Sequence, residues 1–330
     1  MGETRRVDKW PVTLALGEDA IGQRLDRVLV EALRDAGHGL SRNALRASFD
    51  AGDVTEDGRA LKPSLEVSRP MLVAVVLRPP APLSAVPEPV PLSILHEDED
   101  VLVIDKPAGI VVHPSIGHPG GTLVNGVLHH LGVGPDGLPV LPGNDATRPG
   151  VVHRLDRDTS GAMVFTKTQR AAASLAAQFQ AHSIQRRYVG VLGGVPTFDA
   201  RTLDTPHNRD PAERKRFAPV DGGSSRRAVT HVAVVERMPA AAVAHFTLET
   251  GRTHQIRMHA RHFGCPIFGD ALYGKPPKEP SRRRLWTELG RHALHAELLG
   301  FEHPQTRQPV HFVSPLAPEL QALLEVLRVP

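Results

Sequence analysis

Residues 148–167, RPGVVHRLDRDTSGAMVFTK, set two aspartates among arginines at the end of an apolar strand. The valine pair 151–152 is β-branched and predicts a short strand, whereas residues 156–161 are mostly turn formers that end it. The apolar residues 162–165 predict a second strand, so the HRLDRDTSG stretch is a loop between two buried strands. Loops held in this way commonly carry catalytic residues.

Asp156 is the candidate nucleophile of this loop. An aspartate attacks carbon only when it is ionised, and nearby guanidinium groups keep its pKa low even where burial would raise it. Arg154 and Arg157 are near it in sequence. The alternative interpretation of the same residues is a solvated loop with chance ion pairs.

The loop resembles the catalytic motif of the RluA family of pseudouridine synthases, which is close to HRLDxxTSGxxxxAK and has its nucleophile at the position of Asp156. Thr166 stands where the family usually has alanine, which affects packing more than chemistry. Four more segments resemble family segments in the same order. They are residues 101–130, SIQRRYVGVLGG around Tyr188, residues 248–274 with Arg257, and residues 291–304. Five ordered segments argue against coincidence.

The resemblance implies that the protein isomerises uridine to pseudouridine in structured RNA. The nucleotide would be extruded into a pocket, at a cost of about a few kcal/mol, and Asp156 would attack either C1′ of the ribose or C6 of the uracil. Arg257 would keep Asp156 ionised, Tyr188 would stack on the base and take the C5 proton, and Arg154 would hold the displaced base or fill its place. Further candidate substrate-binding residues are His153, Arg252 and His254. No cofactor is expected, because neither redox change nor phosphoryl transfer occurs.

The charge distribution is compatible with an RNA partner. The net charge is only +3, yet residues 81–146 balance at −7, residues 147–230 at +7 and residues 250–294 at +6. The basic segments contain the motif segments, which favours an RNA-facing site. Acidic and basic segments that fold against one another and cancel are the alternative.

Other residue patterns exclude several classes of site. Cys265 is the one cysteine of the sequence, so no internal disulfide framework or cysteine-based zinc site is expected. His254, His259 and His262 lack the i, i+4 spacing of a zinc helix. The N-terminus lacks the apolar core of a signal peptide, and the apolar run 71–77 is too short to cross a bilayer. We expect a cytoplasmic monomer that does not bind membranes and holds no metal.

Prolines divide the chain into two domains. Six of them lie between Pro79 and Pro91, which predicts a semi-rigid linker over residues 79–92. This leaves an N-terminal domain of residues 1–78 and a catalytic domain of residues 93–330. At 330 residues the chain is long enough for both to bury a core.

The N-terminal domain is predicted to be a small α+β unit. Apolar residues 21–33 recur with helical spacing, Ser41 is a candidate N-cap of a second helix, and a hairpin at residues 57–58 precedes a strand at 71–77. This order resembles an S4 RNA-binding domain, in which Arg42 and Arg46 would bind phosphate. Residues 1–80 carry twelve positive and twelve negative side chains, so a packing appendage is the alternative.

The catalytic domain is predicted to be α+β with a mixed, largely antiparallel sheet, because strands outnumber helices without strict alternation. The predicted strands are 101–104, 110–112, 162–165, 188–192, 231–235, 244–248 and 310–313, and the predicted helices are 123–131, 171–181, 253–262 and 319–327. The resemblance implies the pseudouridine synthase fold with a cleft across its sheet. Linker, S4-like domain and motifs together are most similar to the RluD branch, which modifies large-subunit (23S) ribosomal RNA.

Two other functions compete with this hypothesis. The segment Asp158-Thr159-Ser160-Gly161 resembles half of an aspartic-protease dyad, although Asp204 and Asp221 are poor candidates for the second carboxylate. A noncatalytic ribosome-assembly protein that binds RNA could also keep the fold. The intact Asp156 and Tyr188 argue against lost catalysis.

Overall fold

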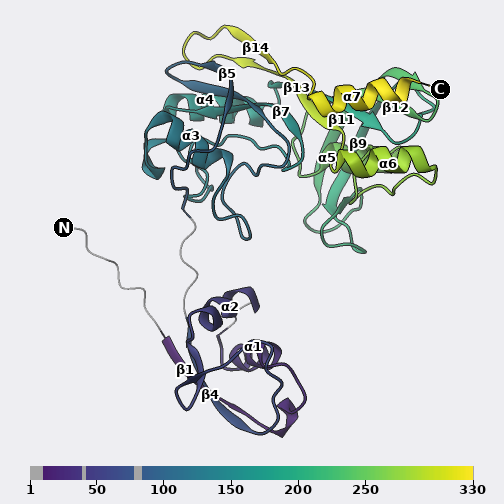
Figure 1. Ribbon diagram of the computed structural model, residues 1–330. Helices are drawn as coiled ribbons and strands as arrows, with labels where there is room; N and C mark the ends of the chain where they lie inside the picture. Colours follow the sequence, from purple (N-terminus) through teal and green to yellow (C-terminus); the bar gives the residue numbers. More distant parts are fainter. Residues whose placement is uncertain (1–9, 39–41, 78–83, 330) are drawn as a thin grey trace. The chain divides into compact units, whose positions relative to one another are not determined.

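The computed structural model describes residues 10–38, 42–77 and 84–329 (Figure 1). The chain divides into two compact units, Met1–Pro82 and Leu83–Pro330, and each unit has its own hydrophobic core. Ser41 and residues 79–83 of the predicted linker lie outside the described residues.

The first unit is a four-stranded antiparallel sheet packed against two helices. Its strands are β1 (Trp10–Leu16), β2 (Val54–Glu56), β3 (Arg59–Ala60) and β4 (Met71–Leu77), in the order β1-β4-β2-β3, and its helices are α1 (Leu25–Asp35) and α2 (Arg42–Asp50), with a 3-10 turn at Glu18–Ala20. Leu25, Leu29 and Leu33 are buried because their spacing puts them on one face of α1. The two helices, the hairpin and β4 are as predicted, whereas β1 was not predicted.

The second unit is built on a ten-stranded sheet in the order β10-β9-β11-β12-β8-β13-β7-β6-β5, with β14 paired to β13. The strands are β5 (Ser93–Glu97), β6 (Val101–Lys106), β7 (Ser160–Thr166), β8 (Gln185–Leu192), β9 (Ala200–Arg209), β10 (Phe217–Ala218), β11 (Arg226–Met238), β12 (Ala241–Leu248), β13 (Leu294–Glu302) and β14 (Pro309–Val313). Among the described strands, β7 and β13 form a parallel pair and the other pairs of this sheet are antiparallel. The predicted mixed, largely antiparallel sheet is therefore confirmed.

Five helices of the described chain pack around this sheet. They are α3 (Leu123–Leu131), α4 (Gln169–Gln180), α5 (Gln255–His262), α6 (Pro280–Leu289) and α7 (Pro318–Arg328), with a 3-10 turn at Pro135–Gly137. Figure 1 shows α3 and α4 near β5 and β7, and α5 to α7 near β9, β11 and β12. The side chain of Thr168 caps α4 by accepting the N–H of Ala171 at 3.1 Å. No helix in the described segments has the length and apolar character needed to span a membrane.

Two predictions for this unit were wrong. Residues 110–112 form no strand, because their carbonyl groups accept hydrogen bonds from the first turn of α3, at 3.0 Å from Leu123 and 2.9 Å from Val124. Residues 84–92 of the predicted linker belong to the second unit, since Ala85 is fully buried and Asn125 donates to the carbonyl of Val86 at 2.6 Å. This proline-containing segment is therefore part of the second unit and not a free connection between the units.

Gly161 fixes how closely the two parallel strands approach. Its φ of +118° is one that other residues rarely adopt, and a Cβ at this position would lie 2.2 Å from the carbonyl oxygen of Ala296. The pairing of Ser160 with His295 continues the contact. The loop before β7 is thereby held against the start of β13.

Candidate active site

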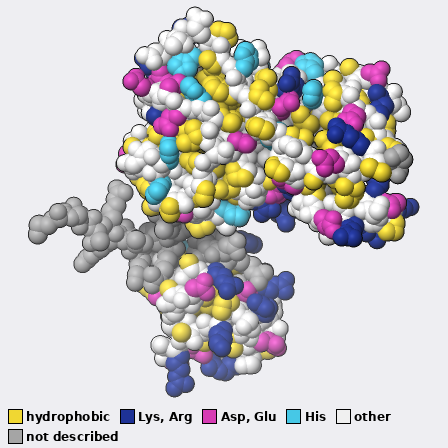
Figure 2. Space-filling model, turned by 45° about the horizontal axis from the view of Figure 1, so that its top comes forward, with side chains coloured by type: hydrophobic (Ala, Val, Ile, Leu, Met, Phe, Trp, Pro, Cys, Tyr) yellow, Lys and Arg dark blue, Asp and Glu magenta, His cyan; other side chains and the backbone are white. Residues whose placement is uncertain are grey.

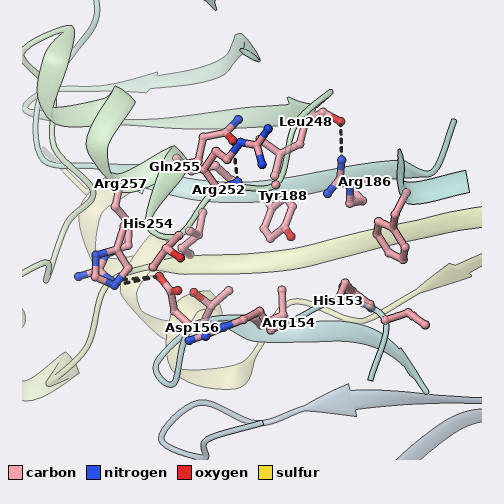
Figure 3. A pocket seen from close by; sticks show the side chains of 18 of the residues that line it. His153, Arg154, Asp156, Arg186, Tyr188, Leu248, Arg252, His254, Gln255 and Arg257 are labelled. Carbon is pink, nitrogen blue, oxygen red and sulfur yellow. Dashed lines mark hydrogen bonds and ion pairs between the residues drawn. The ribbon is translucent and has the colours of Figure 1, made fainter. Parts of the chain in front are cut away.

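A pocket of about 540 Å³ opens between the loop before β7 and the segment before α5 (Figure 3). One wall comes from residues 152–159, and the other comes from β8 and residues 248–257. Figure 3 shows Arg154 and Asp156 on one side of it and Tyr188, on β8, on the other. The volume lies within the range of small-molecule sites, roughly 300–1,000 Å³.

Asp156 and Arg257 form an ion pair inside this pocket. Arg257 Nη1 donates to Asp156 Oδ2 at 3.0 Å, and the side chains are 18% and 9% exposed. The rest of the guanidinium is held by Asp270, which accepts from Nε at 2.7 Å and from Nη2 at 3.0 Å. Asp270 also accepts the backbone N–H groups of Leu272 and Tyr273. Arg257 is thus fixed from behind while one nitrogen faces Asp156.

This ion pair keeps Asp156 ionised. Burial raises the pKa of Asp156, but the positive charges around it, those of His254, Arg257 and His292, outweigh burial and bring the pKa below its usual 3.8. Burial lowers the pKa of His254 and brings that of His292 to about 4, so both rings are neutral at pH 7. Arg257, whose pKa is raised, is therefore the cation that acts on Asp156 at neutral pH.

Lys106 holds the loop that carries Asp156. Its fully buried ammonium donates to the carbonyl groups of Pro107 and Arg157 at 2.8 Å and of Thr159 at 2.9 Å. Burial lowers the pKa of Lys106 to about 7. The three carbonyl acceptors favour the charged form, so the contact ties the loop to the end of β6.

The segment before β13 holds the other side of the loop. Arg291 donates from Nη1 to the carbonyl of Asp158 at 3.1 Å and from Nη2 to Ser160 Oγ at 3.2 Å. His292 shares a hydrogen bond of 2.8 Å with the hydroxyl of Thr159. Both side chains are buried, and they fix the backbone that follows Asp156.

Tyr188 lies on β8 and lines the pocket. It shares the pocket face of the strand with residues two positions away. Its side chain is 8% exposed, and burial raises the pKa of its phenol. The phenol is therefore neutral at pH 7. Arg154 is exposed and also lines the pocket.

Charge in the pocket differs from charge on the surface. On the face seen in Figure 2, basic and acidic side chains are interspersed, and exposed pairs such as Arg227 with Asp204 at 2.7 Å follow the same pattern. The charged side chains that line the pocket are four arginines and one aspartate, namely Arg154, Arg186, Arg252, Arg257 and Asp156. The pocket is thus a cationic site on a surface of mixed charge, which suits an anionic ligand.

Comparisons with known proteins identify the family. The family model for RNA pseudouridylate synthase matches residues 100–262. An uncharacterized RNA pseudouridine synthase of Chlorobaculum parvum is 38% identical over 96% of this chain and 98% of its own length. The chain belongs to the RNA pseudouridine synthase family.

Two further matches, one to a sequence and one to a solved structure, agree with this family. It is 41% identical to the ribosomal large subunit pseudouridine synthase D of Xanthomonas campestris pv. campestris, over 94% of this chain and 91% of that protein. A structure of human RNA pseudouridylate synthase domain containing 4 shares the fold, with a TM-score of 0.55 at 24% identity over 72% of this chain and 93% of that one. The pseudouridine synthase fold of the second unit and the enzyme class predicted by resemblance are confirmed.

The three other residues predicted to bind substrate in this synthase all line the pocket, but they differ in their contacts. Arg252 and His254 line the pocket, and His254 Nε2 lies 3.9 Å from Asp156 Oδ2. His153 also lines it, but its ring stacks on Phe179 with centroids 4.9 Å apart and accepts the N–H of Val164. His153 therefore also supports the wall of the pocket.

The two arginines predicted to bind phosphate belong to the first unit. Arg46 is exposed and lies 3.6 Å from Asp50, one turn along α2. The side chain of Arg42 lies outside the described residues. Their role in RNA binding stays a prediction.

The protease alternative does not fit the surroundings of Asp158. Its two oxygens accept from Arg157 at 2.9 and 3.1 Å. Burial raises the pKa of Asp158, but Arg157, His292 and Lys106 together lower it more, so the carboxyl is ionised. A protease dyad needs two carboxyl groups that share one proton.

Three residues of the site were not predicted from sequence, namely Asp270, Arg186 and Lys106. Asp270 is the first acidic residue in the basic segment 250–294, and that isolation was the available signal. Arg186 lies two residues before Tyr188 and therefore on the same face of β8. Lys106 ends an apolar strand, and nothing in the local sequence indicates its three acceptors.

Proposed function

We propose that this synthase converts uridine to pseudouridine in large-subunit ribosomal RNA, with Asp156 as the nucleophile. The relative in Xanthomonas campestris, which is named for that subunit, supports the substrate. The ion pair of Asp156 with Arg257, at 3.0 Å inside a cationic pocket, is the observation that carries the proposal. It supplies an ionised carboxylate that faces substrate space.

The proposed reaction is an isomerisation of the bound uridine. Asp156 attacks C1′ of the ribose or C6 of the uracil, and the N1–C1′ bond breaks. The uracil turns within the pocket, and C5 bonds to C1′ as Asp156 is released. C5 then loses its proton, and N1 takes up a proton from solvent. Atoms and electrons balance without a cofactor.

The surrounding side chains have distinct proposed roles. Arg257 keeps Asp156 ionised and oriented. Tyr188 stacks on the uracil, and its oxygen accepts the C5 proton as the phenol passes its own proton to water or RNA. Arg154, exposed at the pocket, holds the displaced base or fills the space that the flipped nucleotide leaves. His153, Arg252 and His254 contact the bound nucleotide or the backbone next to it.

We propose that the first unit is an S4-like RNA-binding domain that directs the synthase to its target. The order of α1, α2 and the β2–β3 hairpin supports this assignment, as does the exposure of Arg46. Substitution Arg46→Gln should weaken binding to ribosomal RNA by a few-fold and leave the rate on a short stem-loop unchanged. Equal losses on both RNAs would contradict the assignment. The protein is proposed to act as a cytoplasmic monomer.

Mapping of pseudouridine tests the proposed reaction. Purified protein is incubated with unmodified 23S ribosomal RNA without cofactor, and carbodiimide adducts are mapped by primer extension. New stops are expected at one or a few uridines, and the same stops should disappear from the RNA of cells that lack the protein. An RNA that binds tightly but gains no stop would instead support a noncatalytic assembly factor.

A further inference from the structure

Arg186 is a second buried arginine of the pocket, and the proposed chemistry does not use it. It lies on β8 two residues before Tyr188, so both side chains face the pocket. Figure 3 shows it beyond Tyr188, on the side away from Arg257. Arg186 is 7% exposed.

The hydrogen bonds of Arg186 leave donors unused. Nη2 donates to the carbonyl groups of Glu249 at 2.7 Å and Leu248 at 3.4 Å. Nε is buried and has no hydrogen-bond partner among the residues that the structure describes. A guanidinium has five N–H donors, and buried polar groups are normally satisfied. The unmade bonds therefore indicate a missing acceptor.

Arg186 also lacks a counter-ion. Among the described residues, no carboxylate lies within 4.0 Å of its guanidinium, whereas Arg257 has two. Its neighbours are the ring of Phe179, 5.4 Å from the guanidinium carbon, and neutral groups of the pocket wall. A buried charge without a partner costs free energy, and an anionic ligand would offset that cost.

Gly251 keeps the space beside Arg186 open. A Cβ at this position would lie 2.8 Å from Nη1 of Arg186. At residue 251 the wall of the pocket therefore presents only backbone to the guanidinium. A ligand can approach that nitrogen without meeting a side chain from residue 251.

We propose that Arg186 forms an anion subsite that binds the phosphodiester next to the target uridine. The inference rests on the proposed function, because it assumes that a uridine lies between Asp156 and Tyr188. Arg186 and Tyr188 are separated by about 7 Å along β8, so the subsite extends the pocket beyond the reacting base. A phosphodiester has the full negative charge that uracil lacks, and arginine binds it through paired N–H groups.

Arg186→Gln tests the subsite, with Arg187→Gln as the matched control. Arg187 is the next residue on the strand, faces the other side and pairs with Glu297 at 2.7 Å. We expect Arg186→Gln to lose about 10- to 100-fold in kcat/KM, mainly through KM. The slope of log kcat/KM against log salt should also become shallower by about 0.7–0.9. Arg187→Gln should keep the slope of the wild type.

Arg186→Lys and neutral RNA linkages keep the test decisive if Arg186→Gln folds poorly. The lysine variant keeps the charge and should recover the salt slope. A stem-loop carrying one methylphosphonate next to the target should slow the wild type by about the factor lost in Arg186→Gln, and should slow that variant no further. An unchanged salt slope, or additive losses at every methylphosphonate position, would overturn the subsite. A wild type that makes no pseudouridine would instead overturn the proposed function.

Discussion

The two ends of the pocket contain the same kind of side chain in opposite electrostatic states. At one end Arg257 is paired with Asp156 and Asp270. At the other end Arg186 has no carboxylate partner among the described residues and a buried nitrogen without an acceptor. In the proposed mechanism the ion pair is in place before RNA binds, whereas the unpaired arginine would gain its partner from the RNA. The difference shows that the function of a buried arginine is read from its partners and not from its burial.

Asp156→Asn should have the largest effect, because it removes the proposed nucleophile at the paired end. The loss in kcat should be about 10⁴-fold or more, measured as tritium released from RNA labelled at uracil C5. Asp158→Asn is the matched control, since that residue forms a partly exposed pair with Arg157 and should keep activity within about tenfold. The reverse ranking would break the assignment of the paired end.

Arg257→Met should lower kcat/KM by about 10²–10³-fold at pH 7 and change its pH dependence. In the wild type the pKa of Asp156 lies below 3.8, so the acid limb lies below that pH. Without the cation, burial raises the pKa, and the acid limb should move up by about 1–3 pH units. The stabilisation that the pair gives the fold is complete above pH 3.8 and is lost as the pH falls through the folded pKa. Arg257→Lys should shift the limb less, and an unmoved limb in both variants would contradict this account.

Tyr188→Phe separates the role of the phenol oxygen from that of the aromatic ring between the two ends of the pocket. The variant keeps the buried ring but loses the oxygen, so we expect kcat to fall by about 10²-fold while RNA binding is retained. Tyr188→Leu should lose RNA affinity as well, because it removes the stacking surface. Full activity of Tyr188→Phe would show that the C5 proton leaves by another route.

His254→Asn should have the smallest effect. The ring lies 3.9 Å from Asp156, but burial lowers its pKa and leaves it uncharged at pH 7. Asparagine also tolerates the φ of 57° at this position. We expect less than about a tenfold loss in kcat/KM at pH 7. The acid limb should move up by less than in Arg257→Met, because a charged His254 helps to lower the pKa of Asp156 at low pH. A shift as large as that of Arg257→Met would show that His254 shares the electrostatic role of Arg257 at neutral pH.

The sequence predicted the individual residues of the site better than their assembly. Asp156, Tyr188 and Arg257 lie in recognisable segments, but Asp156 and Arg257 are 101 residues apart, and only the order of the strands brings them together. The anchor Asp270 has no local pattern that indicates its partner. Arg186 could have been paired with Tyr188 by strand alternation, although its missing counter-ion could not.

The elements that sequence missed share a physical reason. β13 is buried on both faces for most of its length, so it has no alternation of apolar and polar residues. β9 is interrupted by charged residues such as Asp204, whose partner Arg227 lies on the neighbouring strand β11. Each strand also has a neighbour that lies outside a local sequence window, β8 for β13 and β11 for β9.

The parallel contact between β7 and β13 predicts that activity begins only after β13 has been synthesised. Ser160 and His295 are 135 residues apart, so the nucleophile's segment leaves the ribosome long before the strand that supports it exists. The closing of such long-range pairs comes late, since the entropy of the intervening chain is lost before the contacts form. We therefore expect a growing chain to lack a complete pocket until β13 has left the ribosome.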